Sequence, residues 1–359
     1  MGKNRNLGFF MIEIIPKIIG FNLFRKIGFP KMLPIFLTLS VNDWCNSRCK
    51  TCNIWRNNPQ KVIEEQLSVE EYGKIFENYG KVYWITITGG EPFLRNDFVK
   101  IIKTVYRQTK PDFLTIATNA TLPEKIISDV KELLAYCKDM NLIVNISLDE
   151  IGPKHDSIRG LKGNFEKAVK TFNLLKKINN PRLIVGINTV VSTYNVNNFS
   201  KIYEYVKNVL KPESFIIEIA EIRSKLYNTN LAITPKYSDY KKVLEFLLSE
   251  LSKARLAKYE IINNLRQEYY KFLLFKSPIK SFEGIASGYI MSNGDVWVSY
   301  TKKFIVGNLR KANYDFRKLW FNENAKKYRQ AMEETYSPML ANAFYVNFIC
   351  NPMEYFKLL

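Results

Sequence analysis

The hydrophobic pattern divides the chain into short apolar runs and longer amphipathic stretches, which alternate from residue 34 onward. The short runs are rich in β-branched residues, as in Trp84-Ile-Thr-Ile-Thr88, and this composition is typical of buried parallel strands. We predict strands at 35–41, 83–88, 113–118, 142–148, 183–191 and 214–220. Apolar residues recur at helical spacing between them, which predicts helices at 69–79, 97–108, 124–138, 164–178 and 198–210.

Six repeats of a strand followed by a helix predict an α/β fold, with a parallel sheet that carries its helices on the outside. Active sites of parallel barrels lie at the C-terminal ends of the strands. After the first two strands the chain places a cysteine-rich loop and the segment Gly89-Gly90-Glu91-Pro92. Polar residues also mark the ends of the later strands, namely Asn119, Ser147, Asp149, Asn188, Thr189, Glu218 and Glu221.

The remainder of the chain predicts three further segments around this 34–222 core. Residues 223–280 form a helical connector, with helical periodicity at 237–275, and residues 281–359 form a small α+β extension. Within the extension, alternating residues flank Asn293-Gly294, a pair that favours a type I′ hairpin turn, and a helix follows near 316–334. The first 33 residues form a separate apolar and basic segment.

Two interpretations of this N-terminal segment stay open. Charges and prolines interrupt residues 7–36, so no apolar run approaches the roughly 18 to 20 residues that span a bilayer, and we expect no signal peptide. The segment either packs as extra helices across the bottom of the domain or lies in a membrane interface. In the second case Arg25, Lys26 and Lys31 lie near lipid headgroups.

Three of the five cysteines lie in one octapeptide, Cys45-Asn-Ser-Arg-Cys49-Lys-Thr-Cys52. Such a CxxxCxxC loop brings three thiolates within reach of one iron-sulfur cube and leaves the fourth iron open, as in catalytic rather than structural metal sites. A structural zinc site would need more cysteines or histidines close by, and disulfides are not expected.

The other sulfur and imidazole side chains receive structural interpretations. We expect Cys137 to be a small core residue and Cys350 to be an inert thiol rather than a remnant metal ligand. The only histidine, His155, is expected in a surface loop.

Composition adds a net charge of +19, from 53 Lys and Arg against 34 Asp and Glu, which favours anionic partners. Much of this charge is spread as single lysines along amphipathic helices, and no arginine-rich run or aromatic stripe predicts specific nucleic-acid binding. Five cysteines, three of them clustered, suit a reducing cytoplasm. We therefore expect a cytoplasmic protein, with peripheral contact to the inner face of the membrane as the alternative for residues 7–36.

The cysteine loop and the Gly89–Pro92 segment, in this order and after the first two strands, resemble the two signatures of the radical S-adenosylmethionine (radical SAM) family. The resemblance covers about residues 34–220 and implies a partial (β/α)6 TIM-type barrel. It implies that Cys45, Cys49 and Cys52 ligate one 4Fe-4S cluster, whose open iron is chelated by S-adenosylmethionine (SAM).

The resemblance also assigns cofactor contacts to the strand ends. Gly89 and Gly90 would let the backbone approach the methionine moiety, Glu91 would accept from its ammonium group, and Pro92 would stiffen the turn. The other implied contacts are Asn119 at the end of the third strand, Ser147 and Asp149 near the sulfonium and ribose, Arg159 at the carboxylate and Asn188 at the ribose.

The cysteine loop departs from the family pattern at Thr51, where many members carry an aromatic residue near the adenine, and we consider Trp55 as a substitute. The extension resembles a SPASM or twitch domain that lacks its cysteines. Phe282, Ser299 or Tyr300, and residues 335–337 stand where such domains place cluster ligands, so a single cluster is expected.

The chemistry implied by the family is reductive cleavage of SAM to a 5′-deoxyadenosyl radical, which abstracts hydrogen from a carbon centre. An electron donor such as ferredoxin or flavodoxin would be needed. The apolar N-terminus favours a membrane lipid or lipid-linked substrate. The alternatives are a peptide-modifying or RNA-modifying enzyme, and a non-catalytic metal-stabilised binding module.

Overall fold

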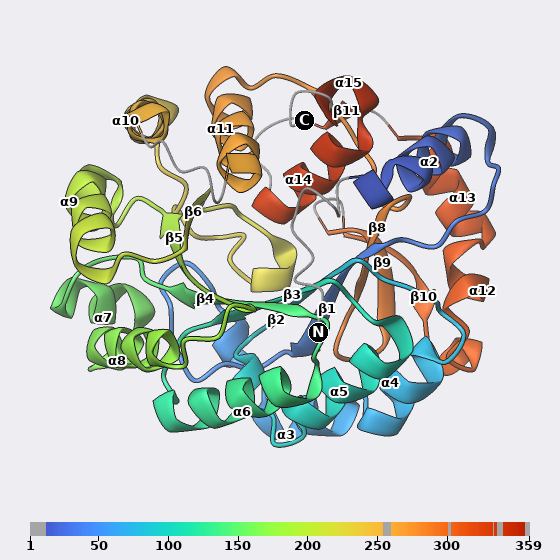
Figure 1. Cartoon of the computed structure of the whole chain (residues 1–359), viewed down its shortest axis with the longest axis horizontal. Helices are drawn as coiled ribbons and strands as arrows, with labels where there is room; N and C mark the ends of the chain where they lie inside the picture. The colour runs from blue at the N-terminus through green and yellow to red at the C-terminus, as the bar shows by residue number, and fades with distance from the viewer. Residues whose placement is uncertain (1–11, 254–259, 301–302, 333, 336–339, 356–359) are drawn as a thin grey trace.

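A curved sheet with six parallel strands forms the core of the protein (Figure 1). The computed structural model describes residues 12–253, 260–300, 303–332, 334–335 and 340–355. The predicted α/β fold is confirmed, and each predicted strand lies within about a residue of its observed bounds. These strands are β1 Phe36–Asn42, β2 Trp84–Gly89, β3 Phe113–Thr118, β4 Asn141–Ser147, β5 Leu183–Val191 and β6 Ser214–Ile219.

Helices follow each strand and cover the outer face of the sheet (Figure 1). Several begin with clear local signals: Ser68 and Glu71 form a capping box that starts α4, and a proline lies in the first turn of α6. The helices that follow β1 to β6 are α3 Pro59–Glu65, α4 Val69–Phe76, α5 Phe98–Thr109, α6 Pro123–Tyr136, α7 Pro153–Arg159, α8 Asn164–Lys177, α9 Phe199–Tyr205 and α10 Tyr237–Lys253.

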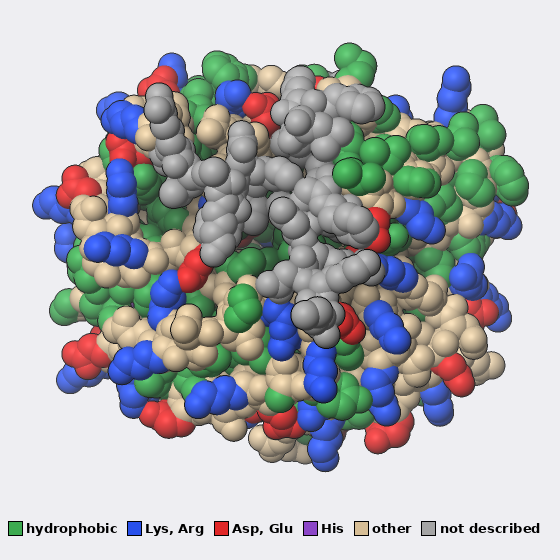
Figure 2. All heavy atoms as spheres, in the orientation of Figure 1, with side chains coloured by type: hydrophobic (Ala, Val, Ile, Leu, Met, Phe, Trp, Pro, Cys, Tyr) green, Lys and Arg blue, Asp and Glu red, His purple; other side chains and the backbone are tan. Residues whose placement is uncertain are grey.

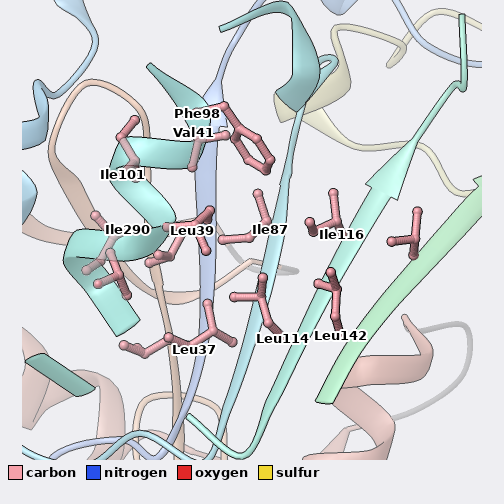
Figure 3. Packing of buried hydrophobic residues seen from close by; sticks show 14 of the residues in the cluster. Leu37, Leu39, Val41, Ile87, Phe98, Ile101, Leu114, Ile116, Leu142 and Ile290 are labelled. Atoms are coloured by element: carbon pink, nitrogen blue, oxygen red, sulfur yellow. The ribbon is translucent and has the colours of Figure 1, made fainter. Parts of the chain in front are cut away.

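Side chains alternate strictly along the strands, so that the two faces of the sheet differ in chemistry. Leu37 and Leu39 of β1, Ile87 of β2 and Ile116 of β3 belong to one hydrophobic cluster with Phe98 and Ile101 of α5 (Figure 3). Burial of each such side chain contributes about 1.5 to 3 kcal/mol. The inner face instead carries small polar residues, which line a cavity: Thr38, Ser40, Thr86, Thr88, Thr115, Asn145, Ser147 and Asn188.

The C-terminal extension continues the same sheet. β8 Ser287–Ile290 pairs in parallel with β1, and the antiparallel strands β9 Asp295–Ser299 and β10 Phe304–Asn308 follow, which gives nine strands in the order β10-β9-β8-β1-β2-β3-β4-β5-β6. Two helices, α12 Phe316–Trp320 and α13 Glu323–Gln330, flank β10, and a second small sheet pairs β7 Ile279–Lys280 with β11 Glu334–Thr335.

The predicted hairpin between β8 and β9 exists, but the predicted type I′ turn is wrong. Such a turn needs a positive φ at both central residues, and of Asn293 and Gly294 only Gly294 has one, at 88°. The Asn293 side chain instead accepts a hydrogen bond from the Asp295 amide at 3.1 Å, and the Gly294 amide donates to the Met291 carbonyl. This side-chain contact stabilises an ordinary turn that ends in the left-handed glycine.

A second core lies on the opposite side of the sheet from α4 to α6. There α11 Glu260–Phe275, α14 Ala341–Cys350, α15 Pro352–Tyr355 and α2 Ile15–Ile27 pack together (Figure 1). In α2 the buried side chains are Ile18, Phe21 and Phe24, and the Asn22 amide donates to the Cys350 carbonyl at 2.9 Å. One face of the described N-terminal segment therefore packs on the protein. No described helix is long and apolar enough to span a membrane.

The remaining cysteines are buried as expected, whereas the histidine is not where we expected it. Cys137 caps α6 inside the main core, and Cys350 ends α14, where burial raises the pKa of its thiol above the usual range. His155 is 0% exposed, so the prediction of a surface position is wrong. It shares one face of α7 with the buried Ile158, three residues along, which excludes both from solvent.

Candidate active site

The loop after β1 places Cys45, Cys49 and Cys52 in the wall of one cavity with a volume of about 430 Å³. Most of the residues predicted for cofactor binding lie in the same wall, although they come from the C-terminal halves or ends of four different strands and from a helix. They are Gly89, Gly90, Asn119, Ser147, Arg159 and Asn188. Glu91, Pro92 and Asp149 lie behind this wall rather than in it.

The three thiols have surroundings that suit iron ligation. Burial raises the pKa of Cys45 to about 12 and that of Cys52 to about 11, so these thiols are protonated at neutral pH unless a metal binds the sulfur and displaces the proton. The side-chain amide of Asn119 donates to the Cys45 sulfur at 3.5 Å, and the Arg159 guanidinium donates to the Cys49 sulfur at 3.8 Å. Such donors stabilise sulfur once it carries negative charge.

The number of thiols suits a cluster. The three cysteines of the loop lie in one cavity wall, and a 4Fe-4S cube can take one thiolate at each of three corners. Structural zinc, in contrast, is almost always bound by four side chains. The donor set therefore fits a 4Fe-4S cluster with one open iron.

Arg159 links the cysteine loop to the end of β4. Its Nε lies 2.8 Å from Asp149 Oδ2, and the other oxygen of Asp149 accepts from the Val190 amide at 2.9 Å. Asp149 therefore fixes the guanidinium beside Cys49 instead of facing the cavity itself. The charge of this buried arginine is balanced by one carboxylate and would also attract anionic sulfur.

The segment after β2 packs directly against the cysteine loop. The Gly90 amide donates to the Asn42 carbonyl at 2.6 Å, and the Glu91 amide donates to the Trp44 carbonyl at 3.0 Å. A Cβ on Gly90 would lie 1.9 Å from the Trp44 oxygen, and one on Gly89, whose φ is +131°, would lie 2.1 Å from the Asn42 oxygen. The two glycines are thus required by the close approach of two backbone segments.

Glu91 connects that segment to the end of β3. Its carboxylate accepts from the backbone amide of Asn119 at 2.7 Å, from the Thr118 hydroxyl at 2.8 Å and from the backbone amide of Phe93 at 3.2 Å. Burial raises the pKa of Glu91 to about 7, although the three donors work in the opposite direction. The structure thus shows a bracing carboxylate, and the predicted contact to a cofactor ammonium stays a prediction.

His155 supports the same region from behind. Its Nδ1 accepts from the Asp149 amide at 3.1 Å, and its Nε2 lies 3.2 Å from Asn164 Oδ1, which requires the proton on Nε2. The side-chain amide of Asn164 in turn donates to the backbone carbonyl of Asn119 at 2.9 Å. Burial lowers the pKa of His155 to about 4, so the ring is neutral and connects the ends of β3 and β4.

Other cavity residues come from elements far from both motifs, and no local motif marks Arg223 or the residues of α11 and α14. Arg223 pairs with Glu221 and lies 5.5 Å from the centre of the Tyr300 ring. The helices α11 and α14 contribute a largely apolar wall, which includes Leu265, Val346 and Ile349. Trp55, considered for adenine packing, is not part of the lining and lies beneath the guanidinium groups of Arg48 and Arg56.

Comparison with known proteins connects this geometry to a family. Residues 39–206 match the radical SAM superfamily model. Over 237 residues the chain is 29% identical to a probable GTP 3′,8-cyclase of Methanococcus vannielii, which covers 65% of this chain and 74% of the relative. Over 148 residues it is 33% identical to the antilisterial bacteriocin subtilosin biosynthesis protein AlbA of Bacillus subtilis, covering 40% of this chain and 31% of AlbA.

Solved structures share the fold. The structure of anSMEcpe with bound AdoMet and Kp18Cys peptide superposes with a TM-score of 0.60 at 19% identity, covering 82% of this chain and 83% of that one. Streptococcus suis SuiB bound to SAM gives 0.59 at 16% identity, covering 83% and 68%. The matched residues 39–206 contain both the cysteine loop and the segment that packs on it, so this part of the chain is a radical SAM domain, of the kind that uses a 4Fe-4S cluster and SAM.

Proposed function

We propose that the reaction takes place in the cavity beside the cysteine loop, on a carbon centre of a substrate held against α11 and α14. The observation that carries this proposal is the single cavity wall, which joins the three cysteines to a largely apolar surface from the C-terminal third. When bound, the cluster and SAM would supply a carbon radical able to remove hydrogen from an unactivated C–H bond.

The residues of the chain would bind and orient these groups. Cys45, Cys49 and Cys52 would ligate the cluster, and the exposed backbone of Gly89 and Gly90 would border SAM. Two buried amide oxygens on the inner face of the sheet, Asn145 Oδ1 and Asn188 Oδ1, have no hydrogen-bond partner among the described residues. Buried acceptors of this kind are costly unless a ligand donates to them, which fits a polar cofactor at this position.

The test is SAM cleavage by anaerobically prepared protein with dithionite, followed by chromatographic detection of 5′-deoxyadenosine. We expect product from the wild type and from Cys137→Ser, whose thiol lies in the core, and none from Cys49→Ser. Absence of product from a wild type that contains iron would refute the proposal and favour a metal-stabilised binding module.

For the substrate class, the surface of α2 supports a membrane lipid or a lipid-linked molecule. The side chains of Ile19, Leu23 and Ile27 are 57%, 44% and 65% exposed, and hydrophobic side chains gather where α2 lies in Figure 2. Lys17 and Lys26 are also exposed on this helix. An apolar stripe with flanking lysines complements an anionic membrane surface, and we propose that α2 lies on one.

Vesicle binding tests this assignment. Vesicles of phosphatidylcholine with phosphatidylglycerol should sediment the wild type, and the triple variant Ile19→Ser, Leu23→Ser, Ile27→Ser should stay in the supernatant. The matched control is Ile63→Ser with Val209→Ser, which removes exposed apolar side chains at 59% and 62% exposure elsewhere. Equal sedimentation of wild type and triple variant would refute membrane contact through α2.

A peptide substrate is the second candidate, and the observation that favours it is the similarity to AlbA, a bacteriocin biosynthesis protein. A peptide-modifying enzyme needs no vesicle surface. If the protein cleaves SAM but does not bind vesicles, the result favours a peptide substrate over a lipid substrate.

A further inference from the structure

Arg266 is a buried cation in the cavity wall, and it is not among the residues assigned to the 4Fe-4S cluster or to SAM. It projects from α11, is 5% exposed, and lines the same cavity as the cysteine loop. Its Nη1 donates to Asn263 Oδ1 at 3.2 Å and its Nη2 donates to Ser214 Oγ at 2.6 Å. Both acceptors are neutral, and the Nε–H has no partner among the described residues.

The carboxylates of the cavity wall have other partners. Glu221 pairs with Arg223, and Glu213 pairs with Lys176. Glu218 accepts from the Ala341 amide at 3.2 Å, and the cation that acts on it most strongly is Arg223. No described carboxylate forms an ion pair with Arg266.

A guanidinium has five N–H donors in a planar fork, and two of those of Arg266 donate to the neutral oxygens of Asn263 and Ser214. Burial of a charge is expensive unless an opposite charge and hydrogen bonds compensate it. The described residues around Arg266 supply no negatively charged acceptor, and the planar fork suits the paired oxygens of a carboxylate or phosphate.

The surroundings of Arg266 restrict the type of anion. The Tyr345 hydroxyl lies within interaction range of the guanidinium, which offsets part of the rise that burial causes in the pKa of this phenol. The neighbouring wall is apolar and includes Leu265, Val346 and Ile349. A small hydrated anion would leave this wall without contacts, whereas an anion with an apolar body would fill it.

We propose that Arg266 binds the phosphate or carboxylate group of an amphiphilic substrate. This proposal rests on the proposed function, since it names the substrate class of the same cavity. It assigns to Arg266 the role of a binding residue, with the apolar body of the substrate lying along α14.

Isothermal titration of the anaerobic protein, without dithionite, tests the proposal separately from catalysis. The probes are octyl phosphate, octanoate, inorganic phosphate and octanol at constant ionic strength. We expect binding of octyl phosphate or octanoate, and the one that binds identifies the anion. Arg266→Gln should weaken it about 30-fold or more, as expected when one partner of a buried charge pair is removed. The control Arg107→Gln changes an exposed arginine on α5 and should bind as the wild type does.

Thermal unfolding establishes that each variant is folded. If Arg266→Gln does not fold, Arg266→Lys takes its place, because it keeps the charge but loses the planar fork, and we expect it to bind more weakly than the wild type. Equal binding by wild type and the Arg266 variant, binding of octanol as tight as that of octyl phosphate, or no binding of either amphiphilic anion would overturn the proposal. A wild type that binds the anion but never cleaves SAM would refute the proposed function alone.

Discussion

Replacement of Gly90 by alanine tests whether the two cofactor loops support each other as the structure indicates. The new Cβ would lie 1.9 Å from the Trp44 oxygen and 2.4 Å from its carbonyl carbon, and both are backbone atoms. A flexible side chain could rotate away, but this carbonyl is held in place by the Glu91 amide. The segment after β2 must therefore move away from the cysteine loop.

The size of the effect follows from the contacts that such a movement breaks. Two backbone hydrogen bonds join the loops, and each contributes about 0.5 to 1.5 kcal/mol. Residual overpacking adds about 1 to 3 kcal/mol. The sum is about 2 to 6 kcal/mol of unfolding free energy, or a decrease in Tm of about 4 to 12 °C at about 2 °C per kcal/mol for a large domain.

Differential scanning calorimetry of wild type and Gly90→Ala provides the assay, and iron content reports on the cysteine loop. The matched control is Gly73→Ala within α4, where a Cβ would meet only Thr104 Cγ2 at an ordinary 3.7 Å. This control should be stabilised by about 0.5 to 1 kcal/mol, because alanine favours a helix interior. A Gly90→Ala protein with the Tm and iron content of the wild type would show that the loops do not depend on this contact.

Three further predictions concern Cys45, Glu91 and His155, with Cys137→Ser as a control. Cys45→Ser should abolish bound iron, whereas Cys137→Ser should keep a single cluster per chain by iron and sulfide quantitation. Glu91→Gln should lower the unfolding free energy by about 1 to 3 kcal/mol, because its amide would face a backbone donor, and an unchanged urea midpoint would contradict a bracing role. For His155 the folded pKa of about 4 lies below the unfolded value of 6.5, so stability is lost as pH falls through this window. The loss is up to about 3 kcal/mol, and His155→Gln should show a correspondingly flatter pH dependence of stability.

The strands were predictable because they depend on local sequence, and the prediction of a metal site also rests on a local motif. Runs such as Leu183-Ile-Val-Gly-Ile187 identify strands by composition, and the spacing of Cys45, Cys49 and Cys52 alone limits the metals that they can bind. The alternation of polar and apolar residues along β1 to β4 was present as well, and it separates the cavity face from the helix face.

Residues whose roles depend on contacts between distant segments were not predictable. The periodicity of α7 places His155 beside Ile158, but nothing in the sequence shows that this face turns inward. The motif predicts a ligand contact for Glu91, which stays a prediction, but the burial of Glu91 against the end of β3 could not be derived from it. Arg266 lies in a helical region without any motif, and only the cavity reveals its role.

The expectation of a single cluster has a structural basis in the extension. Residues 281–359 contain one cysteine, Cys350, and it is buried at the end of α14, so a second cluster would lack thiolates. Near the positions where such domains carry ligands, Glu283 accepts from Tyr289 and Ser299 at 2.9 and 3.0 Å. Residues 336 and 337 lie outside the described part of the chain.

Hydrogen bonds and pairing with β1 hold the described part of the extension against the core. Its side chains Tyr289, Met291 and Tyr300 line the cavity. Because these contacts place the extension in the wall of the cavity where we propose the reaction, the extension fits the role of a wall for the proposed substrate.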